Sequence, residues 1–367
     1  MHFAFTDEQE DLRRAVRALV DRDGGPHVPP PEAPDTGHDT ALWRRLSAEI
    51  GAAGLAVPEE HGGSGASLVE SCLVAEELGR RLVVGPFLGS AVVSAEAVLA
   101  AGDPAACARL LPGLAAGERV VSLAWAEPRS WWSTTECTTT AARDGESWRL
   151  TGEKNFVLDG AQADAVLVVA ATGDGLSLFE VEAPAAITTT PLDPTRPMAR
   201  FEFAGTPARP VGDEGSAGPV LTRCLEVAAV ALAAECVGAA DRWLAEIVGY
   251  VQVREQFGRK IGSFQAVKHR LADLFVAVES ARSLSQAASW AVATRDERGP
   301  EWAAMAKSFC CETYQDVAAE GVQLHGGIGI TWEHEAHLHL KRAHGAAQLF
   351  GTPRSHRQRL ESLLSLH

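Results

Sequence analysis

The sequence predicts a mainly helical α+β protein with an N-terminal helical domain, a middle β-barrel or β-sandwich domain and a C-terminal four-helix bundle. Two changes in the residue pattern lead to this prediction. An apolar period near 3.6 residues gives way to short alternating segments at Val120, and the helical period returns in long stretches from Val220. We therefore expect three domains, at residues 1–115, 116–210 and 211–367.

The size and composition of the chain limit its possible partners. A length of 367 residues fits two or three packed units. The formal net charge is -15 and no long basic run is present, so neither nucleic acid nor a membrane is expected as a partner. Seven scattered cysteines without a Cys-x-x-Cys pair predict no disulfide framework and no metal site. We expect a soluble cytoplasmic protein, since no apolar run reaches the roughly 18 residues of a membrane span.

The first domain is predicted from helix signals. Thr6 and Gln9 form a capping-box pattern, and the apolar face that follows repeats through Val16 and Val20. The stretch 24–39 predicts a loop, because its three consecutive prolines lack backbone donors. Further helices are predicted over residues 41–50, 68–82, 89–101 and 105–114.

The two later domains follow from the same kind of pattern. Strands are predicted at 120–125, 138–142, 148–151, 155–158, 165–170, 176–180 and 199–203, which fits a small barrel or sandwich. Long helices are predicted at 220–254, 263–296, 301–321 and 333–347.

Two short signatures bracket the C-terminal helical region. They are REQFGRKIGSFQ at 254–265 and QLHGGIGIT at 323–331. Three further motifs are PEEHGG at 58–63, Ala126-Glu127-Pro128 and Gly152-Glu153-Lys154. Together these motifs resemble the acyl-CoA dehydrogenases over nearly the whole chain, and the chain is similar to the short actinobacterial subunits of heteromeric steroid or long-chain acyl-CoA dehydrogenases.

The resemblance implies a FAD-dependent flavoprotein oxidoreductase of lipid metabolism. Such an enzyme introduces an α,β double bond into a bulky acyl thioester, either acyl-CoA or acyl-carrier, and passes electrons to an acceptor flavoprotein. It would work as a homo-oligomer, or as a hetero-oligomer with a homologous subunit. Two alternatives stay open: a non-catalytic subunit that completes another chain's FAD site, and a recruited enzyme that acts on a carrier-bound substrate.

The resemblance also implies the residues that bind the adenosine diphosphate half of FAD. Arg254 would contact the pyrophosphate of a neighbouring subunit's FAD, with Phe257 beside it, because a guanidinium pairs well with a diphosphate. Gln323, Gly326 and Gly327 would meet the same half, since glycines let the backbone approach a ligand closely. Each motif alone fits a surface arginine or a helix end; together they favour a flavin site.

The residues expected at the isoalloxazine ring depart from the family pattern. Ala126, Phe156 and Leu158 stand where the resemblance places a threonine, a tryptophan and a second threonine, so an aromatic ring survives but two hydroxyls that could bond the flavin ring are lost. The loop that follows Pro128 carries Trp131 and Trp132, which would line a wider pocket, stack on adenine or pack at an interface. Packing is the favoured interpretation.

The catalytic base departs furthest from the family pattern. The reaction needs a carboxylate that removes the α-proton of the thioester. The resemblance places Phe350 and Ala228 at the two positions where family members carry their glutamate. Glu235 lies seven residues after Ala228 on the same helix face and follows an apolar run, so it is the predicted base. A structural ion pair is an equal alternative for Glu235. Glu333 and His337 have metal-chelating spacing, but the resemblance favours a solvated helix and no metal.

Overall fold

The computed structural model describes residues 5–26, 38–145, 147–188 and 192–365. Its internal contacts group the chain into two units. The first comprises Met1–Pro26, Cys72–Val83 and Ala229–His367, and the second comprises His27–Ser71 and Val84–Ala228. The predicted loop at 24–39 lies mostly outside the described residues.

A closed sheet forms the centre of the second unit. The strands are β1 (Val121–Ala124), β2 (Thr140–Asp144), β3 (Ser147–Leu158), β4 (Ala165–Thr172), β5 (Gly175–Glu182), β6 (Ile187–Thr188) and β7 (Met198–Val211). They pair in the order β1-β4-β2-β3-β7-β5, and an additional β4–β5 pairing closes the sheet into a barrel. Trp148, Phe179, Phe201 and Phe203 fill its core.

Strand β3 carries an irregularity that matters for the site. The sequence predicts two strands, at 148–151 and 155–158, but the structure has one continuous strand that pairs antiparallel with β7. The register shifts between Lys154 and Val157, as at a β-bulge. Phe156 lies in this shift with a left-handed φ of 55°, so its side chain is aimed differently from those of the regular strand.

Helices complete the second unit. They are α2 (Thr40–Arg45), α4 (Ala95–Ala101) and α5 (Pro104–Ala115). The predicted helices at 41–50 and 89–101 are found, but each includes a π-helical part, at Leu46–Ile50 and at Phe87–Ser94. Asp103 caps α5 by accepting the amides of Ala105 and Ala106.

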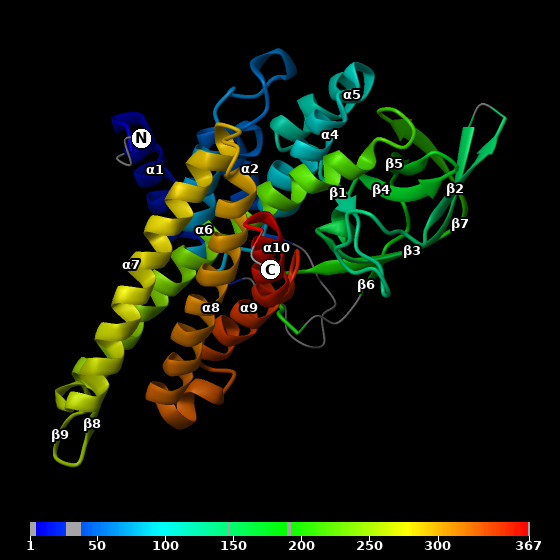
Figure 1. Ribbon diagram of the computed structural model, residues 1–367. Coiled ribbons are helices and arrows are strands. Elements are labelled where there is room, and N and C mark those ends of the chain that lie inside the picture. The colour runs from blue at the N-terminus through cyan, green and yellow to red at the C-terminus, as the bar shows by residue number, and fades with distance from the viewer. Residues whose placement is uncertain (1–4, 27–37, 146, 189–191, 366–367) are drawn as a thin grey trace. The chain divides into compact units, whose positions relative to one another are not determined.

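The first unit is helical. It contains α1 (Asp7–Asp23), most of α3 (Leu68–Arg80) and of α6 (Ala217–Val253), α7 (Gln265–Ala293), α8 (Gly299–His325), α9 (Ala336–Gln348) and α10 (Pro353–Leu363). The predicted capping box of Thr6 and Gln9 is present at α1. A short hairpin, β8 (Glu255–Gln256) and β9 (Arg259–Lys260), follows α6 (Figure 1). The predicted fold class is therefore confirmed, and α10 and the hairpin are additions.

Helices α3 and α6 touch through their backbones. A Cβ atom added at Gly79 would lie 2.1 Å from the carbonyl oxygen of Glu235, and one at Gly238 would lie 1.8 Å from that of Glu76. Only glycine permits this approach. The contact fixes the backbone of α6 at Glu235, the residue predicted as the base.

A buried charge cluster joins α1, α3, α6 and α7. Its members are Arg13, Arg17, Glu76, Glu77, Arg80, Asp241 and Arg282. Burial raises the pKa of Glu76, and the charges of Arg282 and Arg13 oppose that rise. Because each buried carboxylate has an arginine partner, the cluster avoids the penalty of an unpaired buried charge. In the described parts of the chain, no helix is long and apolar enough to cross a membrane.

Candidate functional site

The hairpin after α6 presents Arg254 and Phe257. The amide of Arg254 donates to the carbonyl oxygen of Tyr250 at 2.9 Å, and its own carbonyl accepts the amide of Ile261 at 2.8 Å. These bonds fix the backbone, whereas the exposed guanidinium has no ion pair within the described residues. Phe257 has a left-handed φ of 55° and is 91% exposed. The hairpin thus offers an unpaired cation beside a bare aromatic ring.

The end of α8 presents Gln323, Gly326 and Gly327. Gly326 ends the helix with φ 63° and ψ -138°, a conformation that favours glycine, so it has the helix-stop role that the sequence left open. A Cβ at Gly326 or Gly327 would meet no other atom of the chain within 4 Å. The packing of the chain does not require a glycine at position 327. A glycine there does leave the backbone open to a ligand. Gln323 is exposed on the last turn.

An open hollow of about 410 Å³ lies between the C-terminal half of α6 and the two histidines His325 and His334. It is lined by Arg242, Ala245, Glu246, Gly249, Tyr250, Val253, His325 and His334. The hollow includes His325 of the second signature and Val253, the residue before the first signature, whereas Arg254, Gln323, Gly326 and Gly327 do not line it. The Tyr250 and His325 rings stack with centroids 4.2 Å apart. Burial lowers the pKa of His325, which keeps this stack uncharged at neutral pH.

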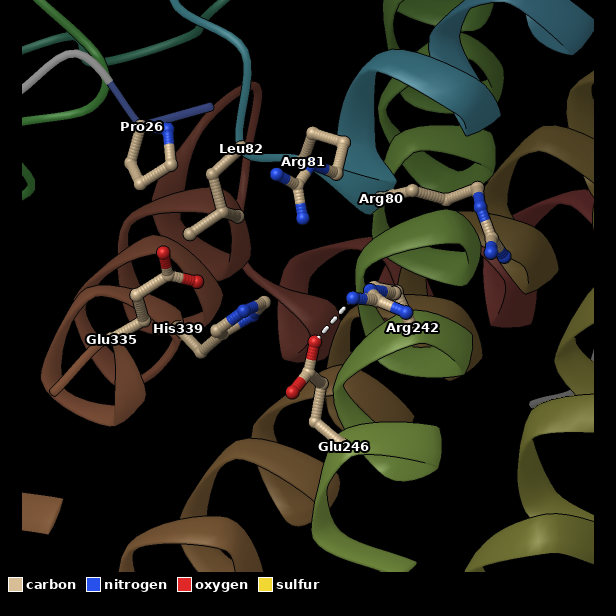
Figure 2. Close-up of a pocket in the computed structure, with 8 residues that line it drawn as sticks. All are labelled: Pro26, Arg80, Arg81, Leu82, Arg242, Glu246, Glu335 and His339. Carbon is tan, nitrogen blue, oxygen red and sulfur yellow. Dashed lines mark ion pairs between the residues drawn. The ribbon is translucent and has the colours of Figure 1, made fainter. Parts of the chain in front are cut away.

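A smaller pocket lies next to the hollow and is not large enough for a cofactor. Its volume of about 10 Å³ fits roughly one water molecule. Figure 2 shows Arg80 and Arg81 on one side, Glu335 and His339 on the other, and the Arg242–Glu246 ion pair that lines both spaces. Burial lowers the pKa of His339 to about 3. The described residues contain no group of histidine, cysteine and carboxylate side chains that could hold a metal ion.

The residues predicted at the ring half of the cofactor lie in the second unit. Phe156 is 38% exposed and stacks on Trp131, with centroids 5.6 Å apart and an interplanar angle of 14°. We call these two rings the aromatic platform. Ala126 is fully buried, and its carbonyl accepts the amide of Asn155 at 2.9 Å. Ala126 therefore fixes the strand beside the platform and exposes no side-chain atom of its own.

A buried ion pair joins the two motifs behind the platform. Lys154 Nζ donates to Glu127 Oε1 at 2.7 Å, and both side chains are fully buried. The amides of Thr138 and Thr139 also donate to this carboxylate. Burial alone would raise the pKa of Glu127, but Lys154 and these donors hold it well below its usual value. Sequence reasoning singled out both motifs and missed their pairing, which the opposite charges could have suggested.

The predicted base lies in an ion pair. Glu235 is 8% exposed, and the Nε atom of Arg342 donates to its carboxylate at 3.0 Å. Arg342 also donates to the carbonyl oxygen of Val83. This arrangement is the structural alternative that the sequence left open, and the catalytic role of Glu235 stays a prediction. Phe350 and Ala228, the other two positions considered for a base, are buried apolar residues.

Comparison with known proteins identifies the class that this fold and site define. The acyl-CoA dehydrogenase N-terminal domain model matches residues 6–118, and the C-terminal domain model matches residues 218–362. The chain belongs to the acyl-CoA dehydrogenase family, and it is a flavoprotein oxidoreductase with FAD as its cofactor.

Three similar proteins can be named. Acyl-CoA dehydrogenase IpdE2 of Mycobacterium tuberculosis is 40% identical over 97% of both chains. The structure of a variant of the Tcur3481-Tcur3483 steroid ACAD is 30% identical, with a TM-score of 0.85 over 98% of both chains. The ChsE4-ChsE5 complex from Mycobacterium tuberculosis is 30% identical, with a TM-score of 0.87 over 100% of both chains.

The residues present fit FAD. The unpaired guanidinium of Arg254 and the open backbone at Gly327 suit a diphosphate. The exposed rings of Phe156 and Trp131 suit a planar conjugated ring. The ring half has fewer hydrogen-bonding groups, because Ala126 and Leu158 are apolar and buried.

Proposed function

We propose that this chain is one subunit of a heteromeric FAD-dependent acyl-CoA dehydrogenase that acts on a bulky acyl thioester, and that a homologous subunit supplies the base. The observation that carries the proposal is the buried ion pair between Glu235 and Arg342. Its carboxylate is buried against Arg342, so a proton taken up there would break a buried ion pair. Phe350 and Ala228 offer no carboxylate in its place.

In this proposal the chain contributes binding and orientation. Bound FAD supplies the acceptor for the hydride that leaves the β-carbon of the thioester. Arg254 neutralises charge on the cofactor's diphosphate, and the open backbone at Gly327 allows the phosphates to approach closely. The aromatic platform orients the ring half. Electrons then pass to an acceptor flavoprotein.

Two observations support a hetero-oligomer. Two similar structures each pair two proteins, Tcur3481 with Tcur3483 and ChsE4 with ChsE5, and the first pair is described as a steroid ACAD. Large apolar side chains are also exposed at the end of the bundle that carries the hairpin. These residues, which we call the apolar bundle end, are Val253, Phe257, Ile328, Ile330 and Trp332. Such exposure is typical of a surface that binds another protein.

Co-expression tests this function. The chain is purified alone and together with a homologous dehydrogenase-like subunit encoded beside it, and the absorption spectrum gives FAD per chain. We expect stable FAD only in the pair, and flavin bleaching by a bulky acyl-CoA only when the partner's base is intact. A chain that binds FAD alone and is reduced by thioester without a partner contradicts the proposal.

The second candidate is that Glu235 performs the proton transfer itself, as its helix face predicts. A single Glu235→Gln change removes the carboxylate that forms an ion pair with Arg342, so it alters stability as well as chemistry. We therefore pair it with Arg342→Met, so that neither charge of the pair is left alone, and compare this double variant with the wild-type complex at equal FAD content. Loss of a general base lowers flavin reduction by about 100- to 10,000-fold. We expect the double variant in the complex to reduce its flavin at the wild-type rate; a loss of that size assigns the base to Glu235.

A further inference from the structure

The buried Glu127–Lys154 pair fixes the two segments that carry the aromatic platform. Glu127 and Trp131 exchange backbone hydrogen bonds, with the Trp131 amide donating at 2.9 Å and the Glu127 amide at 3.3 Å. Lys154 lies two residues before Phe156 on β3. The ion pair of 2.7 Å therefore sets the spacing between the turn with Trp131 and the bulge with Phe156.

The backbone at both rings is unusual. Trp131 has φ 46° and Phe156 has φ 55°, left-handed values that bulky residues seldom adopt. Strain of this kind persists where the surroundings enforce it, and it gathers at ligand sites. Here the two rings form a nearly parallel stack, and Trp131 stays 54% exposed.

The neighbouring tryptophans support the loop and leave this indole uncovered. Trp125 Nε1 donates to the carbonyl oxygen of Ser133 at 2.5 Å. Trp132 packs edge-on against Trp125, with centroids 5.8 Å apart. The loop is thus held by Trp125 and Trp132, whereas Trp131 presents a flat, rigid surface. Such a surface matches a planar conjugated ring better than a flexible acyl chain.

We propose that Trp131 contacts the cofactor directly, its indole stacking on the isoalloxazine ring of FAD with Phe156 packed behind it. The inference rests on the proposed ring-side role of Phe156. It assigns a binding function to the loop after Pro128: stacking on the face of the ring adds contact energy at a site where Ala126 offers no hydrogen bond to the ring edge. Sequence alone favoured packing for this residue, and the exposed stack is the observation that changes that assignment.

Flavin fluorescence in the purified complex with the homologous subunit tests this contact. An indole in contact with an excited isoalloxazine donates an electron and takes it back, so emission is lost without net chemistry. A phenyl ring does not do this. We expect bound FAD to emit weakly in the wild-type complex and several-fold more strongly in Trp131→Phe, at unchanged FAD content. Trp131→Ala removes the stack and should weaken FAD binding by roughly 5- to 150-fold, the range for one aromatic stacking contact.

Trp132→Phe is the matched control, since it makes the same chemical change one residue away. Its emission should stay near that of the wild type, and far-ultraviolet circular dichroism should be the same for all variants. FAD that is bound by the complex but shows equal emission in wild type and Trp131→Phe overturns the inference and leaves the proposed function standing. A larger rise in Trp132→Phe also overturns it. A complex without any FAD rejects the inference and the proposed function together.

Discussion

At the scale of single residues, a substitution at Arg254 can distinguish a role in cofactor binding from a role in the fold. Its backbone closes the hairpin, but its side chain makes no ion pair in the described chain. Arg254→Ala should therefore leave thermal stability unchanged. It should weaken FAD binding in the complex by about 1.5–3 kcal/mol, the value of a hydrogen bond to a charged group. Isothermal titration of the FAD-depleted complex measures this.

Arg259 is the matched control for Arg254, because it lies on the same hairpin and its guanidinium covers the Phe264 ring at 3.9 Å. Arg259→Ala should have a smaller effect on FAD and a larger one on the hairpin. Equal FAD affinity for wild type and Arg254→Ala would count against the assignment of Arg254 to the diphosphate.

Gly326 and Gly327 are expected to be glycine for different reasons, one for the fold and one for cofactor binding. Gly326 has φ 63°, so Gly326→Ala should destabilise the fold by ~1–3 kcal/mol through backbone strain. Gly327 has neither a left-handed φ nor a close neighbour. Gly327→Ala should change the free energy of unfolding by less than ~0.5 kcal/mol, yet weaken FAD binding because the methyl group meets the phosphates. Chemical denaturation and FAD titration, run on both variants, check this; FAD affinity that Gly327→Ala leaves intact contradicts the role.

At the scale of elements, the sequence predicted what local patterns determine. The capping box of Thr6 and Gln9 and the long helical periods are local, and both were found. Helix α10 was missed although Thr352 and Pro353 carry a start signal, because its buried residues are few. The opposite charges of Glu127 and Lys154 are compatible with a pair, but whether the two side chains meet, like the bulge at Phe156, depends on how distant segments align, which no local pattern specifies. The domain limits at 115 and 210 stay predictions, which limited proteolysis can test.

Removal of either partner of the Glu127–Lys154 pair should destabilise the barrel. Lys154→Met leaves a buried carboxylate with amide and hydroxyl donors but no cation, and should cost about 3–5 kcal/mol of stability. The double change Glu127→Gln, Lys154→Met should cost less. The pKa of Glu127 is lower in the folded chain than its ordinary 4.5. Its contribution is therefore complete above pH 4.5 and is lost as pH falls through the lower, folded value.

Urea denaturation at several pH values measures both effects. In the wild type, the free energy of unfolding should fall with acidification below about pH 4.5. In the double variant this part of the slope should vanish. An identical slope in the two proteins would show that other carboxylates, such as those of the buried charge cluster, account for acid sensitivity.

At the scale of the whole molecule, the chain keeps the fold of the family but lacks a carboxylate at the positions expected for the catalytic base. The helical and barrel parts are those of an acyl-CoA dehydrogenase. The positions where the resemblance places a base hold Phe350 and Ala228, and Glu235 is tied to Arg342. Arg254 and Gly327, which we propose to face the diphosphate, are exposed. This asymmetry is what a subunit would have if it completes a cofactor site and leaves proton transfer to another chain.

The last prediction concerns assembly through the apolar bundle end. Ile330 is 74% exposed on the 3-10 helix Gly326–Ile330, so the isolated chain loses no packing when it is replaced. Ile330→Asp should therefore fold normally, but a buried, unpaired carboxylate in an interface should oppose association. Light scattering on the co-expressed pair should show a shift to smaller species, and FAD should be lost with it. Leu363→Asp, an exposed change on α10, is the control and should leave the assembly intact. An Ile330→Asp complex of wild-type mass would place the contact surface elsewhere on the bundle.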